Sequence, residues 1–199
     1  ATNNIFSPSS GKPINTPSQD ITLGSYFLTH TREFPHKGGQ EPRKPLFGDQ
    51  SEVELALSEG GLELHQKIMF KNPDKGRKTI FGNEKDTVIE TTPGRVRFNE
   101  IWPAALGFYN KQAGKKQLSD IIWRCWQVSG HVETVAALDR LKEMGFKVAT
   151  LSGCSIGIFD MVIPVEKKEE LEKAYVRLDE IDKQHRRGII TDRERYNMI

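Results

Sequence analysis

The residues that could carry out catalysis lie in the last fifty positions. Residues 153–157 have the G-x-S-x-G spacing of a serine hydrolase, and Asp160 and His185 follow Ser155 in the chain order of an α/β-hydrolase triad. A nucleophilic serine of this class stands on a sharp turn that joins a strand to a following helix. Here a helical pattern precedes Ser155 and an extended, β-branched pattern follows it. A serine hydrolase that uses Ser155 is therefore kept only as an alternative.

A second chemical signal is the basic middle of the chain. Residues 67–116 contain eleven Lys or Arg against five Asp or Glu, whereas residues 49–66 contain five acids and neither Lys nor Arg. Arg95 and Arg97 alternate with apolar residues, which predicts a strand with both guanidinium groups on one face. A planar guanidinium suits phosphate oxygens. The pattern favours a phosphate-facing surface, with a solvated strand as the alternative.

The composition excludes several classes of protein. The net charge is only +2, and the two cysteines, Cys125 and Cys154, do not form a disulfide framework. The five histidines have no metal-ligand spacing, and no apolar run approaches the roughly 18 residues that span a membrane. No signal-peptide pattern is present. We therefore expect a reducing, cytoplasmic setting, no bound cofactor and no membrane partner.

Apolar periodicity and turn signals predict an α+β fold. A small mixed β/α domain is followed by a helix pair, and then by a long charged helix with a truncated partner helix. Gly24 lies inside the first predicted helix, where it suggests close packing against another backbone. Gly130 separates the helix pair and Gly145 is expected to end it. The expected helices cover residues 17–28, 50–59, 118–128 and 132–146, and the expected strands cover residues 62–68, 78–81, 86–92 and 95–99.

The end of the chain reads as an unfinished helical hairpin. After an extended segment that stops at Pro164, residues 166–187 predict one helix, which Gly188 ends. Thr191 and Glu194 have the spacing of a capping box that starts a second helix. The apolar stripe of the long helix is expected to be only partly covered, at Leu171, Tyr175 and Leu178. We expect a fragment of a larger protein, in three parts: residues 1–105, 106–163 and 164–199.

Short motifs along the whole chain resemble the largest-subunit family of multisubunit RNA polymerases, in the bacterial branch called β′. They occur in the order of the family: Thr2-Asn3-Asn4, Ser7-Pro8, Pro17-Ser18-Gln19-Asp20 and Gly24; Thr91-Thr92, Gly94-Arg95 and Phe98-Asn99; Gly145-Phe146 and Ala149-Thr150; Ser152-Gly153, Ser155-Ile156, Asp160 and Ile163-Pro164; and Gly188, Thr191 and Glu194-Arg195-Tyr196-Asn197.

The resemblance implies a position for this chain within the polymerase. It corresponds to the pore domain and the beginning of the funnel, which surround the secondary channel through which NTPs enter and backtracked RNA 3′ ends leave. The hairpin is similar to the rim helices, on which transcription factors dock. The implied channel-facing candidates are Asn3, Gln19, Asp20, Arg95 and Arg97, and the implied docking candidates are Gly188, Thr191, Glu194, Arg195 and Asn197.

The resemblance also implies which chemistry the chain lacks. The Asn-Ala-Asp-Phe-Asp-Gly-Asp loop that holds the catalytic magnesium in this family is absent from the sequence. We therefore expect a part of a nucleotidyltransferase that has no catalytic residue of its own, with magnesium and zinc bound elsewhere in the subunit. The implied partners are the β, α and ω subunits, NTPs, RNA and secondary-channel factors. A stand-alone factor-docking module without catalytic activity is the alternative.

Overall fold

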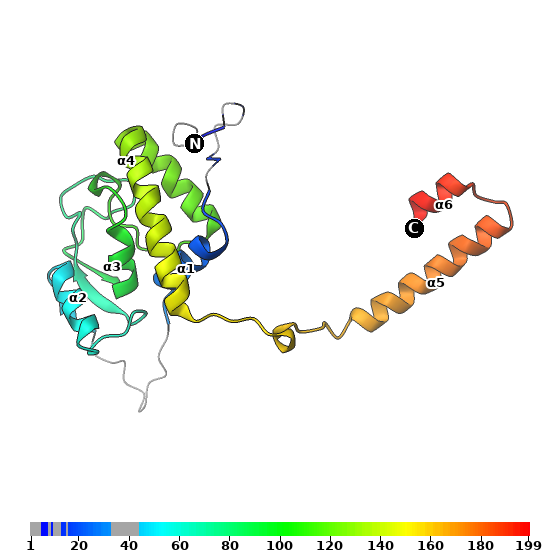
Figure 1. Ribbon diagram of the computed structural model, residues 1–199, viewed down its shortest axis with the longest axis horizontal. Helices are drawn as coiled ribbons and strands as arrows, with labels where there is room; N and C mark the ends of the chain where they lie inside the picture. The colour runs from blue at the N-terminus through cyan, green and yellow to red at the C-terminus, as the bar shows by residue number, and fades with distance from the viewer. Residues whose placement is uncertain (1–4, 8, 10–12, 15, 33–43) are drawn as a thin grey trace. The chain divides into compact units, whose positions relative to one another are not determined.

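The computed structural model describes residues 5–7, 9, 13–14, 16–32 and 44–199. The chain separates into two compact units, residues 1–154 and 155–199, rather than into the three expected parts. Helices and a small sheet occur together, which confirms the α+β class. In chain order the elements are α1 (Gln19–Thr29), β1 (Leu46–Phe47), α2 (Gln50–Ser58), β2 (Ile68–Lys71), β3 (Val88–Thr91), α3 (Pro93–Asn99), η1 (Ala104–Leu106), α4 (Lys115–Ser152), η2 (Ile158–Asp160), α5 (Lys167–Arg186) and α6 (Asp192–Met198) (Figure 1).

The sheet is small and mixed. Its strand order is β1-β2-β3, with β1 parallel to β2 and β2 antiparallel to β3. The prediction of a strand over residues 62–68 was wrong, because β2 begins only at Ile68. The backbone carbonyls of Leu64 and His65 accept hydrogen bonds from the N–H groups of Gly94 and Arg32 instead. This stretch therefore pairs with the ends of other elements and not with a neighbouring strand.

One apolar core connects the N-terminal helix to α3, η1 and α4. Its fully buried side chains include Leu28 of α1, Phe98 of α3 and Leu106 of η1, together with Ile122 and Leu141 of α4. The cluster draws on both sides of the expected boundary at residue 105, so this boundary does not divide the core. A smaller cluster joins α2, the sheet and α3 through Val53, Ile68, Phe70, Val96 and Phe108.

Helix α4 contains both members of the expected helix pair. Gly130 has φ of 75° and ψ of −175°, so it interrupts the helix at the predicted position. The prediction that Gly145 ends the second helix was wrong, because α4 continues to Ser152 and Gly153 ends it in the left-handed conformation. Gly145 serves a packing role instead: a Cβ at this position would lie 2.9 Å from the Cα of Ile21 in α1.

The crossing of α1 and α4 requires glycine on both helices. A Cβ at Gly24 would lie 2.1 Å from the carbonyl oxygen of Gly145, which is closer than any real contact. The prediction of close backbone packing at Gly24 is thereby confirmed. Helix α3 approaches α1 in the same way, since a Cβ at Gly94 would lie 1.9 Å from the carbonyl oxygen of Leu28. Two backbone-to-backbone contacts therefore set the positions of α3 and α4 around α1.

Replacing Gly24 by Ala is expected to lower the free energy of unfolding by about 3 kcal/mol, the upper range for overpacking, because backbone cannot move aside as a side chain can. In an exposed helix the same change would stabilise by up to about 1 kcal/mol. Urea unfolding followed by tryptophan fluorescence measures the effect, since Trp102, Trp123 and Trp126 all lie in the first unit.

Gly61→Ala is the matched control for this measurement. A Cβ at Gly61 would meet only the carbonyl oxygen of Ala56, at 3.8 Å, so a change within about 0.5 kcal/mol is expected. A Gly24→Ala variant as stable as the Gly61→Ala variant would contradict the close approach.

Candidate functional site

The segment that carries Arg95 and Arg97 is a helix and not the predicted strand. Thr92 caps α3, because its side-chain oxygen accepts a hydrogen bond from the backbone N–H of Arg95 at 3.3 Å, and Pro93 stands at the first helical position. Polar and apolar residues alternate over residues 95–99, and this short alternation resembles the pattern of a strand. The two arginines consequently have separate sets of partners.

Arg95 connects three segments of the first unit. Its Nε donates to the backbone carbonyl of Thr29 at 3.1 Å, its Nη2 donates to Thr31 Oγ1 at 2.8 Å, and its Nη1 donates to Asn110 Oδ1 at 3.2 Å. Burial lowers the pKa of Arg95, but a guanidinium still carries its charge at neutral pH. The side chain therefore holds the end of α1 and the 107–113 loop against α3.

Arg97 forms a bidentate ion pair with Glu54 of α2. Its Nε donates to Glu54 Oε1 at 2.5 Å and its Nη2 donates to Oε2. The hydrogen bonds to Glu54 raise the pKa of Arg97. Burial, and then the charge of Glu54, raise the pKa of the neighbouring Glu100, whereas Arg97 lowers it. The pair joins α2 to α3 at a position where about a third of each side chain is exposed.

The other channel-facing candidates are not gathered around these arginines. Asn3 lies outside the described residues. Gln19 and Asp20 are exposed in the first turn of α1, where Gln19 has an unusual φ of 48°. Arg95 binds the opposite end of the same helix, at Thr29. Eleven residues at about 1.5 Å per residue put the two ends of α1 roughly 15 Å apart. These candidates therefore do not form one compact site.

Two histidines contact each other beside Arg95. The ring of His65 lies 5.9 Å from that of His30, and its Nδ1 is 3.2 Å from the backbone carbonyl of His30. Gln112 Nε2 is 3.1 Å from His30 Nδ1. The pKa of His65 is lowered, chiefly by burial and further by the charges of His30 and Arg32, against the raising effects of the His30 backbone hydrogen bond and Glu63. The surroundings therefore favour a neutral His65.

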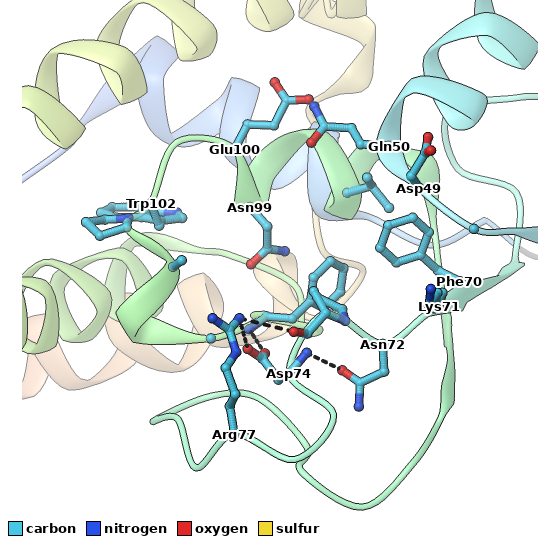
Figure 2. A pocket seen from close by; sticks show the side chains of 17 residues that line it. Asp49, Gln50, Phe70, Lys71, Asn72, Asp74, Arg77, Asn99, Glu100 and Trp102 are labelled. Carbon is cyan, nitrogen blue, oxygen red and sulfur yellow. Dashed lines mark hydrogen bonds and ion pairs between the residues drawn. The ribbon is translucent and has the colours of Figure 1, made fainter.

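A cavity that the sequence did not predict lies between α2, β2, α3 and η1 (Figure 2). Its volume is about 560 Å³, which is in the range of small-molecule sites. Apolar side chains line much of it, among them Phe70, Val96, Trp102 and Phe108. Asp74, which is buried, accepts hydrogen bonds from the Phe108 N–H at 2.5 Å and from Arg77 at 3.3 Å. The buried carboxylate is thus engaged in holding the wall of the cavity.

In the second unit, capping and ion pairs hold α5 and α6 together. Gly188, with φ of 70°, ends α5, and Thr191 and Glu194 form the predicted capping box, with the Thr191 N–H 2.8 Å from Glu194 Oε2. Arg195 Nε donates to Asp182 Oδ1 of α5 at 2.7 Å. His185 Nε2 lies 2.7 Å from Asp192 Oδ1. Three of the docking candidates, Thr191, Glu194 and Arg195, are therefore engaged in forming the hairpin.

The apolar stripe of α5 is covered at one end only. Ile181 is buried, whereas Leu171 is 43% exposed and Tyr175 is 65% exposed. Leu178 is partly buried. The partial cover that the sequence predicted is confirmed.

The hydrolase alternative is wrong. The carboxylate of Asp160 accepts a hydrogen bond from the Gly157 N–H at 2.7 Å, and His185 pairs with Asp192, so Asp160 and His185 do not pair with each other as the proposed triad requires. No hydrogen bond joins Ser155 to His185, both of which the structure describes. Across the described ranges, no cluster of three or more His, Cys, Asp or Glu is arranged to hold a metal ion. None of the described helices is long and apolar enough to cross a membrane.

Comparison with known proteins decides the family. Residues 4–161 match the family described as RNA polymerase Rpb1, domain 3. The chain belongs to this family. It is also 57% identical, over 196 residues, to the DNA-directed RNA polymerase subunit beta' of Methylacidiphilum infernorum, covering 98% of this chain and 14% of that protein. The corresponding subunit of Opitutus terrae is 48% identical over 200 residues, and that of Aquifex aeolicus is 44% identical over 199 residues.

The Rpb1 domain 3 family and these relatives confirm the resemblance seen in the sequence. The alignments with the last two relatives cover 100% of this chain but only 14% and 12% of those proteins, so the chain spans a small part of the relatives it matches. The hairpin lies beyond residue 161, where the family match ends, but within the stretch that the β′ relatives share.

Arg95→Lys is expected to lower the free energy of unfolding by about 2 kcal/mol, because hydrogen bonds from a charged donor to the end of α1 and to the 107–113 loop are lost. Arg97→Lys serves as the control and should cost less than about 1 kcal/mol, since its pair with Glu54 is partly exposed to solvent. Urea denaturation of both variants checks this order, and equal losses would count against the connecting role of Arg95.

His65 is expected to make the fold less stable in acid. Its pKa in the folded chain lies below the ordinary 6.5, so the unfolded chain binds the proton more tightly. Its contribution is therefore complete above pH 6.5 and is lost as the pH falls below that value. Urea midpoints at about pH 7.5 and about pH 5.5 should differ less in His65→Gln than in the unmodified chain. An unchanged difference would remove His65 as a cause.

Proposed function

We propose that this chain acts as part of the β′ subunit of a DNA-directed RNA polymerase and thus takes part in transcription. The observation that carries the proposal is the 44–57% sequence identity to β′ relatives, which extends over 98–100% of the chain. The proposed partners are the β, α and ω subunits of that enzyme, and the proposed setting is the cytoplasm.

The chain's proposed part in nucleotidyl transfer is structural rather than chemical. The described residues hold no carboxylate cluster that fits magnesium and no cysteine cluster that fits zinc. We place both metals in other segments of the subunit and assign no catalytic step to this chain. It shapes the wall of the secondary channel, along which NTPs and the RNA 3′ end would pass.

Arg95 and Arg97 have different contacts, and we therefore propose different roles for them in the channel wall. Arg95 is committed to Thr29, Thr31 and Asn110, so it acts by holding the wall in place. Arg97 is partly exposed beside Glu54 and is the better placed of the two to contact a passing phosphate. Exposed lysines at positions 71, 75, 78 and 85 add positive charge to the same unit. Such a surface attracts triphosphates over a distance of about 10 Å.

The α5–α6 hairpin is the proposed docking surface for secondary-channel factors. Because Thr191, Glu194 and Arg195 maintain the hairpin, the side chains left to meet a factor include Ile189, Tyr196 and Asn197, all exposed. A factor-docking module that works without the rest of the enzyme is the second candidate function, because the Arg195–Asp182 pair and the His185–Asp192 contact join α5 to α6 within this chain.

Ile189→Asp in the complete subunit, assembled into polymerase, tests the docking role. We expect factor-stimulated transcript cleavage to fall at least tenfold, because burying an unpaired charge at an interface costs at least about 1.4 kcal/mol. RNA synthesis without the factor should stay within about twofold. Glu172→Gln, on the exposed face of α5, is the control.

The outcomes of this experiment separate the two candidate functions. Unchanged cleavage by the Ile189→Asp enzyme would contradict docking at the hairpin. Equal factor affinity of the isolated chain and the assembled enzyme would favour the stand-alone module.

A further inference from the structure

The cavity between α2, β2, α3 and η1 has no part in the function proposed above (Figure 2). Its volume of about 560 Å³ is large enough for a ligand built on an aromatic ring. Three aromatic side chains line it, and Phe70, Trp102 and Phe108 are each only 7% exposed. The ring centroids of Phe70 and Phe108 lie 6.0 Å apart. The cavity therefore has an aromatic wall that is largely shielded from water.

The charged side chains that line the cavity leave an excess of negative charge. The described lining residues include three carboxylates, against the two positive groups of Lys71 and Arg77. Arg77 pairs with Asp74 at 3.3 Å, so these two charges offset each other. Lys71 then remains against Asp49 and Glu100. Aromatic rings attract a cation through their faces, and the surplus carboxylate favours the same sign of charge.

Glu100 is the lining carboxylate whose charge is left unmatched. No described residue donates a hydrogen bond to it, and the neighbouring Arg97 is held by both carboxylate oxygens of Glu54. Burial, and then the charge of Glu54, raise the pKa of Glu100, although Arg97 lowers it. Asp49, in contrast, accepts a hydrogen bond from the backbone N–H of Glu52 at 3.0 Å and caps α2. A positive group on a ligand would supply the partner that Glu100 lacks.

We propose that this cavity binds a small organic cation with an aromatic body, such as an aromatic amidine. The ring packs against Phe70, Trp102 and Phe108, and the positive group pairs with Glu100. A neutral ligand of the same shape would leave Glu100 unpaired, and an anionic one would be repelled by the surplus negative charge. The inference is independent of the chain's place in the polymerase, because every lining residue belongs to the first unit.

Probes of one shape and different charge test the proposal: benzamidine is a cation, benzamide is neutral and benzoate is an anion. Each is titrated into the isotope-labelled chain, and NMR follows the indole N–H resonances of its tryptophans. Trp102 lines the cavity, whereas Trp123 and Trp126 pack against Phe6. Benzamidine should shift the Trp102 resonance alone, in a saturable way. It should bind at least about fivefold more tightly than benzamide or benzoate.

Glu100→Gln tests the partner of the positive group, because it keeps the shape of the side chain and removes its charge. The dissociation constant for benzamidine should rise at least about fivefold, while that for benzamide should stay within about twofold. Glu172→Gln, on the exposed face of α5, is the control and should change neither value. Unchanged resonances of Trp123 and Trp126 in each variant verify that the first unit is folded.

Several results would overturn the proposal. Benzamide or benzoate that binds as tightly as benzamidine would show that the cavity does not select a cation. A probe that shifts Trp123 or Trp126 and not Trp102, or that shifts none of them, would show that the cavity is not the site. Equal affinity of benzamidine for the Glu100→Gln variant and the unmodified chain would remove Glu100 as the partner. The charge series needs no variant, so it decides the proposal even if Glu100→Gln fails to fold.

Discussion

The first unit depends on how closely α1 approaches two other helices. Gly24 meets the backbone of Gly145 in α4, and Gly94 of α3 meets the carbonyl oxygen of Leu28. Contacts between backbones leave no space for a methyl group, so the crossing geometry is fixed by the absence of side chains and not by their shape. The buried apolar side chains then fill the space between the three helices.

The end of α1 also organises the polar interactions of this unit. Buried Thr29 donates to the carbonyl of Ser25 and accepts from the N–H of Ala113, and its carbonyl receives Arg95. These groups of Thr29 all have hydrogen-bond partners within the chain. Through them the end of α1 holds the 107–113 loop, which has little regular structure of its own. The arginine that the sequence nominated for phosphate thus belongs largely to the scaffold.

The second unit is held together mainly by polar interactions rather than by an apolar core. Its hairpin relies on a capping box and on ion pairs near the surface, such as Arg195 with Asp182, and it buries little apolar area. Exposed ion pairs contribute little to stability, and short helices are marginal alone. Leu171 and Tyr175 of the α5 stripe, and the apolar side chains of residues 156–165, are therefore left uncovered within this unit.

The sequence by itself determined the features that rest on local hydrogen bonds. Capping at Thr191, the interruption at Gly130 and the end of α5 at Gly188 involve groups only a few residues apart, so their spacing was sufficient. Its motifs also indicated the family, which the comparisons confirmed.

Only the tertiary structure decided what depends on distant neighbours. Residues 95–99 alternate like a strand, yet they form a helix that packs against α1 at Gly94. Gly145 carried the signal of a helix end, but its real constraint is the passage of α1 beside it. The partners of Arg95 and the walls of the cavity come from segments far apart in the chain. No local pattern records which distant segment will fill the space beside a residue.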